Sequence, residues 1–259
     1  GGGAVNALRR GAMSEHPLPP HAAPTQDWQP AQARLGLTAI FGATFFELVG
    51  YFMLTPLLIL RLKGDGVSTA LAGVFAASGW LGILLMVPFA SSITRALGRR
   101  PTLWLSALIP TLATAAFALT EVLWLWFVLK IAAGMASGLR WVLAEAVVAE
   151  FSPPGQRGRM VGMFETMVGV TFVVGPGLLA WVGPDSDVAI WIALGFLCIG
   201  LFWSLLIPRM PDAADAHSAE VGLSGVWVAL RLHPLIVAVG FVGGFFESGL
   251  TSILPLYGL

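Results

Sequence analysis

The sequence has little charge of either sign. Of its 259 residues only 11% are Asp, Glu, Lys or Arg, whereas 57% are hydrophobic and the mean hydropathy is +0.83. Soluble domains carry about a quarter charged residues, so a surface of this composition could not be covered in water. The 14 basic residues balance 14 acidic ones, which leaves no positive field to attract nucleic acid. These shortages exclude a soluble enzyme and a nucleic-acid-binding protein.

Residues that hold metals, nucleotides or disulfides are also scarce. The single cysteine, Cys198, cannot form an intrachain disulfide, and the four histidines lack the spacing of metal ligands. No phosphate-binding loop of the Gly-x-x-x-x-Gly-Lys-Ser/Thr type occurs, so ATP-driven transport by this chain is unsupported. We therefore expect no metal site and no cofactor.

Long hydrophobic runs, in contrast, fill most of the chain. A membrane-spanning helix needs about 20 mostly apolar residues. Seven segments meet or nearly meet this length, and together they predict a polytopic all-α membrane protein. We place them at 35–60, 68–91, 101–120, 122–149, 160–182, 188–208 and 234–259.

The segments between these runs predict the domain organisation and the orientation. Residues 1–33 read as a disordered tail, 34–208 as a six-helix bundle, 209–233 as a cytoplasmic linker and 234–259 as a seventh helix. With a cytoplasmic N-terminus, the outer loops would hold only Arg61 and Lys63 as basic residues, which agrees with the excess of Lys and Arg in cytoplasmic loops.

The first and seventh segments resemble each other. Phe45-Phe46-Glu47 recurs as Phe245-Phe246-Glu247, and a proline follows each glutamate after eight or nine residues. Both segments run in the same direction, as parallel repeats of six-helix halves require. The second copy has only its first helix here, so we expect the chain to be a fragment of a protein with about twelve spans.

Several motifs in the expected order and spacing resemble the major facilitator superfamily. The loop Thr94–Pro101 is similar to its motif A, with one extra residue before Gly98 and with Thr94 in place of Asp. Lys130-x-x-x-Gly134-x-x-x-Gly138 is similar to motif B, with Lys in place of Arg. Three further similarities follow. Glu150-x-x-Pro and the later Arg157-Gly158 match the end of the fourth span in this family, and Gly175-Pro176 resembles the antiporter motif C. The ending Leu254–Leu259 resembles an efflux-type member.

The resemblance implies a fold and a function. The fold would be a six-helix half-bundle of that superfamily plus the first helix of the second half. The function would be secondary active transport of a small organic solute across the cell membrane by alternating access, with proton-coupled efflux (antiport) favoured. The partners would be substrate, protons, the lipid bilayer and the missing C-terminal half of the protein.

Two carboxylates in the middle of spans need an explanation. A charged group at mid-helix costs about 2.5–3.5 kcal/mol on insertion scales, so it normally has a use. Glu47 and Glu247 lie near the midplane of the first and seventh spans, and we expect them to face each other across a central cavity. There they would bind a proton or a cationic substrate; the alternative is a protonated group that hydrogen-bonds neighbouring helices.

The fourth span carries three ionisable residues. Lys130 lies nearer the outer side and would contact an anionic group or a helix partner. Arg140 either faces the cavity as a substrate or counter-ion contact or extends to the inner headgroups. Glu145 is a further candidate, and it points in a different direction from Arg140 because the two lie five residues apart on a helix.

The inner loops and the small residues predict two structural roles. We expect Arg99 or Arg100 to contact Glu150 in an inner gate; the alternative is that the arginines only fix topology. The gate candidates are Arg95, Gly98, Arg99, Arg100, Glu150 and Arg157. Gly134 and Gly138 would allow close helix packing, and Gly175-Pro176 would bend the fifth span or form a tolerated kink.

Two other functions remain open from the sequence. A membrane-embedded enzyme would need clustered Asp or His at a membrane face, and no such cluster occurs. A seven-helix receptor is the second alternative. Its retinal-binding form fails, because the last lysine is Lys130 and a retinal Schiff base needs one late in the bundle.

Overall fold

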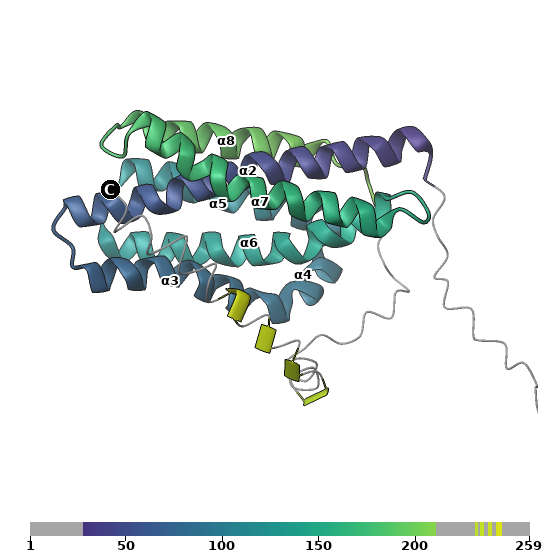
Figure 1. The fold of residues 1–259 in the computed structure, drawn as a ribbon, viewed down its shortest axis with the longest axis horizontal. Coiled ribbons are helices and arrows are strands. Elements are labelled where there is room, and N and C mark those ends of the chain that lie inside the picture. Colours follow the sequence, from purple (N-terminus) through teal and green to yellow (C-terminus); the bar gives the residue numbers. More distant parts are fainter. Residues whose placement is uncertain (1–27, 211–230, 233, 236–237, 240–241, 245–259) are drawn as a thin grey trace, which may run out of the picture.

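The computed structural model describes residues 28–210 and, further on, 231–232, 234–235, 238–239 and 242–244. Residues 28–210 are helical apart from short connections and contain no strand. The elements run roughly along one axis (Figure 1). They are α2 (Pro30–Gly64), α3 (Thr69–Met86), the 3-10 turn η1 (Val87–Phe89), α4 (Ala90–Leu97), α5 (Arg99–Leu119), α6 (Leu123–Phe151), α7 (Arg157–Val182) and α8 (Val188–Leu205).

Six helices in the described part of the chain are long and apolar enough to cross a membrane, when α3, η1 and α4 are taken as one. The first six predicted spans are therefore confirmed. Two boundaries differ. α2 begins at Pro30, inside the expected tail, because proline is favoured in the first turn of a helix. The second span continues to Leu97, after a 3-10 turn that contains Pro88, whose ring cannot donate a helical hydrogen bond.

The predicted seventh helix falls mostly outside the described residues. Residues 234–235, 238–239 and 242–244 are helical, and Glu247 lies outside the described part of the chain. The pairing of Glu47 with Glu247 across a cavity therefore stays a prediction.

Two helices organise the bundle. α2 packs against α8, α7 and α6, while α6 packs against α3 and α5, and α5 also contacts α8. Figure 1 shows α2 and α6 running through the bundle with the other helices beside them. The faces of α2 and α6 that meet these helices are therefore buried.

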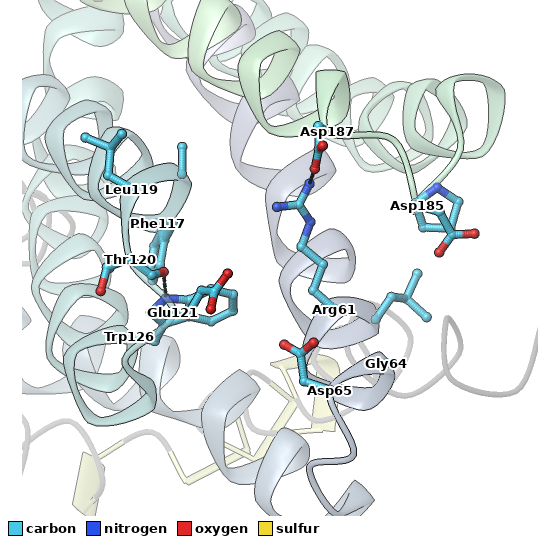
Figure 2. A pocket seen from close by; sticks show the side chains of 13 residues that line it. Arg61, Gly64, Asp65, Phe117, Leu119, Thr120, Glu121, Trp126, Asp185 and Asp187 are labelled. Atoms are coloured by element: carbon cyan, nitrogen blue, oxygen red, sulfur yellow. Dashed lines mark hydrogen bonds and ion pairs between the residues drawn. The ribbon is translucent and has the colours of Figure 1, made fainter.

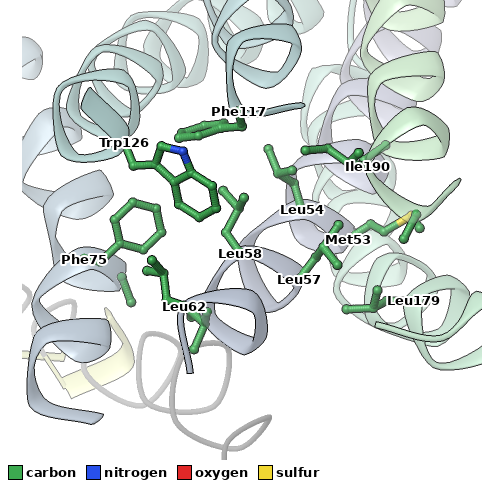
Figure 3. Packing of buried hydrophobic residues seen from close by; sticks show 14 of the residues in the cluster. Met53, Leu54, Leu57, Leu58, Leu62, Phe75, Phe117, Trp126, Leu179 and Ile190 are labelled. Carbon is green, nitrogen blue, oxygen red and sulfur yellow. The ribbon is translucent and has the colours of Figure 1, made fainter. Parts of the chain in front are cut away.

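One of the two apolar clusters shows how α2 forms the centre. Met53, Leu54, Leu57 and Leu58 project from α2 toward residues of five other helices (Figure 3). These partners are Phe75, Phe117, Trp126, Leu179 and Ile190. The outer surface is apolar as well, with Val173 74% and Trp181 84% exposed, as a bilayer requires.

Glycines bring α3 and α6 into direct backbone contact. A side chain at Gly134 would collide with the carbonyl oxygen of Gly79, and a Cβ at Gly138 would lie 3.0 Å from the carbonyl oxygen of Ile83. The close packing expected at Gly134 and Gly138 is thus present between these two helices.

Gly175 has a similar role on α7. A Cβ there would lie 2.8 Å from the Cβ of Phe52 and 2.9 Å from the backbone nitrogen of Met53 on α2. α7 is a continuous helix across Pro176, so the pair packs against α2 without interrupting the fifth span.

Candidate functional site

An ion pair joins the middles of α2 and α6. Glu47 Oε2 lies 2.7 Å from Arg140 Nε, and each side chain is only 5% exposed. Both charges are therefore enclosed by the six-helix bundle. In a medium of low dielectric, removing either partner leaves the other as an uncompensated charge. Arg140 does not extend to the inner headgroups, because its guanidinium is held by Glu47.

Arg140 also binds two further helices, α8 and α5. Its Nη2 donates to Ser204 Oγ of α8 at 3.1 Å, and its Nη1 donates to the carbonyl oxygen of Leu103 on α5 at 3.4 Å. Four helices thus meet at one guanidinium. Ser204 is not evident in the sequence as a partner, because a serine in an apolar helix commonly bonds its own backbone.

Lys130 is buried nearer the other end of α6. It is 2% exposed, and its Nζ donates to Thr55 Oγ1 at 2.9 Å. The ammonium also lies 4.8 Å from the centre of the Tyr51 ring, a cation–π contact. Among the described residues no carboxylate lies within ion-pair distance of Lys130. Lys130 therefore has a helix partner, one of the two expected kinds.

Glu145 lies at an exposed position near a small pocket between α2, α6 and α7. Thr44, Glu47, Ser137 and Arg140 also line the pocket. Glu165 on α7 lies close enough for its charge and that of Glu145 to repel each other. As expected from their spacing, Arg140 and Glu145 do not form an ion pair with each other.

At one end of the bundle the predicted contact between Arg99 and Glu150 is present. Arg99 Nη1 and Glu150 Oε2 form a short ion pair that joins the start of α5 to the end of α6. Both helices belong to the same six-helix unit, so this contact alone does not close a passage between two halves. Its role in gating stays a prediction.

The other gate candidates are not gathered around Glu150. Arg95 donates to Ser92 Oγ of its own helix at 3.4 Å. Arg100 donates to the carbonyl oxygen of Leu205 and stacks on the Trp104 ring at 4.6 Å. Gly98 makes the turn between α4 and α5 with φ +84°, a conformation that glycine adopts readily, and the exposed Arg157 begins α7.

The opposite end of the bundle carries an open acidic pocket of about 730 Å³ (Figure 2). Asp65, Glu121, Asp185 and Asp187 line it together with Arg61. Arg61 Nη2 lies 3.7 Å from Asp187 Oδ1, and Asp187 is 99% exposed, so this contact is weak. Within the described residues no group of three His, Cys, Asp or Glu side chains could hold a metal ion.

The sequence pattern that defines the Major Facilitator Superfamily matches residues 40–259. The chain belongs to the major facilitator superfamily. The resemblance expected from the motifs is thus confirmed. Together with the six apolar helices, the match makes the chain part of a multi-pass membrane protein of a transporter family.

Similar proteins place the chain within this superfamily. The uncharacterised transporter YfkF of Bacillus subtilis is 25% identical over 212 residues, which is 80% of this chain and 54% of YfkF. The class C tetracycline resistance protein of Escherichia coli is 32% identical over 143 residues, 54% of this chain and 36% of that protein. The chain spans about half the length, or less, of these relatives.

Solved structures show the same fold. The human organic anion transporter MFSD10 superimposes with a TM-score of 0.59 at 21% identity, over 70% of this chain and 49% of that one. A peptide transporter crystallised with alafosfalin gives a TM-score of 0.57 at 14% identity, over 80% of this chain and 46% of that one. The six-helix unit is therefore the half-bundle of this superfamily.

Proposed function

We propose that this protein is a secondary transporter that moves a small organic solute across the cell membrane by alternating access and couples the movement to protons. The N-terminus is cytoplasmic in this proposal, and a second six-helix half completes the passage. The two halves rock about a site near the midplane.

The observation that carries the proposal is the buried ion pair of Glu47 and Arg140. A charged pair in the middle of a membrane bundle is costly to insert and is typical of proton relays. When Glu47 accepts a proton, its attraction to Arg140 is lost, while Arg140 keeps its bonds to Ser204 and Leu103. Proton binding therefore changes how α2 is held to α6, and movement of these helices can follow.

Lys130 supplies a third charged side chain of the proposed site. Its ammonium is held by a hydroxyl and an aromatic ring instead of a carboxylate. Because no described carboxylate pairs with it, this cation can attract an anionic group of a substrate or a carboxylate of the second half. The Arg99–Glu150 pair and the other inner-gate candidates stabilise the cytoplasmic end in this proposal.

Export is the favoured direction. A relative is named for resistance to tetracycline, and removal of a drug from the cell is one way to produce resistance. Resemblance to antiporter motif C at Gly175-Pro176 points the same way. Proton entry would then drive solute exit.

The test is proton movement in liposomes that contain the purified natural protein and a pH-sensitive dye, with tetracycline as the first probe. Addition of the probe should move protons across the membrane, and Glu47→Gln should abolish this movement. Glu121→Gln is the matched control, because Glu121 lies at an exposed loop position. Full proton movement in Glu47→Gln would rule out the coupling role, and conversion of a substrate without net flux would favour the enzyme alternative.

A further inference from the structure

The small pocket between α2, α6 and α7 lies directly beside the buried ion pair. It is lined by Thr44 and Glu47 of α2, by Ser137 and Arg140 of α6, and by Phe164 of α7. Glu145, which also lines it, is exposed on the surface of the half-bundle. The pocket therefore reaches from the ion pair to the surface on which Glu145 lies.

The size of the pocket and a few polar groups in its lining suit water. Its volume is about 30 Å³, and a bound water needs about 10–15 Å³ and two to four polar partners. Hydroxyl groups, a carboxylate and a guanidinium all line the pocket. Apolar side chains form most of the pocket surface, so a water there has to be held by the few polar groups of Thr44, Glu47, Ser137 and Arg140.

Three polar atoms in the lining have no hydrogen-bond partner among the described residues: Thr44 Oγ1, Glu47 Oε2 and Arg140 Nε. The last two face each other as an ion pair, so Thr44 Oγ1 is the atom of the three without any polar partner there. Thr44 is only 5% exposed. The buried Thr111 and Thr114 instead donate to carbonyl oxygens of their own helix, each at 2.8 Å. The Thr44 hydroxyl is thus left for a partner in the pocket, since an unpaired buried hydroxyl is costly.

We infer that this pocket is a water site in which Thr44 and Glu47 bind one or two water molecules, and that Glu47 exchanges protons with the Glu145 side of the bundle through them. In each step a water accepts a proton on its oxygen and releases another, so only O–H bonds form and break. Thr44 is a positioning residue that holds the water against the carboxylate. This proton route adds detail to the proposed function. Its role in transport depends on that proposed function being correct.

The charges around Glu47 are few and can be named. α6 contributes Arg140 in direct contact and Glu145 at the exposed side of the pocket, and α7 contributes Glu165 near Glu145. Tyr51 of α2 also lines the pocket. α8 contains no charged residue, and α5 carries only Arg99 and Arg100 in its first turn. The carboxylates on the open side attract protons toward the pocket.

Hydroxyl-radical footprinting of the natural protein in nanodiscs tests whether the pocket holds water. The method modifies buried side chains that lie next to bound water. Phe164 is 3% exposed and lines the pocket, whereas Phe75 is 0% exposed and lies in the apolar cluster. We expect modification of Phe164 and none of Phe75. Thr44→Val should lower the modification of Phe164 several-fold, and the control Thr111→Val should leave it unchanged. A Phe164 as unreactive as Phe75 would show a dry pocket and overturn the inference.

The route is tested separately in the liposomes. Probe-driven proton movement should fall several-fold in Thr44→Val and stay unchanged in Thr111→Val, and Ser137→Ala is the second variant if Thr44→Val does not fold. The route would be overturned if footprinting shows that the pocket of Thr44→Val is dry and the same variant still moves protons normally. If the unmodified protein moves no protons, the proposed coupling fails, while the footprinting still decides whether the pocket binds water.

Discussion

At the scale of the residue, the Glu47–Arg140 pair makes a distinct prediction about stability. Arg140→Met should lower the free energy of unfolding by about 3–5 kcal/mol, because it leaves the Glu47 carboxylate buried without its counter-charge. The double variant Glu47→Leu/Arg140→Met should recover most of this loss, since no charge then remains. Ser204 keeps its bond to the carbonyl oxygen of Gly200, so its hydroxyl stays paired.

Unfolding of the purified single and double variants in detergent, followed by circular dichroism, measures these values. Losses that simply add in the double variant would contradict the pairing, because contacting residues couple and independent ones do not. Arg61→Met is a control for loss of an arginine. Arg61 contacts the fully exposed Asp187, so this change should cost less than about 1 kcal/mol.

Lys130 makes the opposite prediction for stability. Lys130→Met replaces the ammonium by an apolar group of similar length, and Thr55 keeps its bond to the carbonyl oxygen of Tyr51 at 3.1 Å. No buried polar atom loses its last partner, so the thermal unfolding temperature should stay the same or rise. Solute transport in liposomes should fall nonetheless, if the charge serves the substrate. A destabilised variant, or a stable one with full transport, would contradict this account.

At the scale of the element, the α3–α6 contact should be sensitive to a single methyl group. Gly134→Ala would place a Cβ against the carbonyl oxygen of Gly79, and both backbones must move apart. Overpacking of this kind costs about 1–3 kcal/mol. Gly169→Ala on α7 is the matched control, because a Cβ there meets no atom within 4 Å.

The two glycine variants are compared by the fraction of monomeric protein that survives a heat ramp in detergent. We expect Gly134→Ala to lose monomer at a lower temperature and Gly169→Ala to behave as the unmodified protein or better, since alanine favours helix over glycine by about 1 kcal/mol. Equal stability of the two variants would show that α3 and α6 lie further apart than described.

The elements were largely predictable from hydrophobic runs, because a bilayer demands about 20 apolar residues in each span. The buried ion pair of Glu47 and Arg140 was not predictable in this way, since a run of apolar residues does not show which side of a helix faces its neighbours. Part of the lining of the pocket could have been predicted from the spacing of residues in the sequence. Thr44, Glu47 and Tyr51 follow one another at three and four residues, and so share one face of α2.

At the scale of the whole molecule, the charges divide between the two ends of the bundle. The end with Arg99 and Glu150 carries the arginines of the α4–α5 turn, and the opposite end carries the acidic pocket around Asp65, Glu121 and Asp185. This asymmetry favours a cytoplasmic position for the arginine-rich end, since Lys and Arg accumulate in cytoplasmic loops. Figures 1 and 2 show the helices and the pocket concerned.

The orientation can be decided by labelling thiols in intact cells with a reagent that does not cross membranes. Cys198 on α8 is an exposed thiol that would itself react, so it is first replaced by Ser. Asp185→Cys, in the loop between α7 and α8, should then react in intact cells, because the proposed orientation places that loop outside. Gln156→Cys, just before α7, should react only after the cells are made permeable.

The length of α7 makes this labelling pattern decisive. Its 26 residues separate the two positions by about 39 Å, which is more than the hydrocarbon thickness of a bilayer, so one reagent cannot reach both from the same side. The reverse pattern would place the N-terminus outside, and the arginine-rich end could then not serve as the cytoplasmic gate.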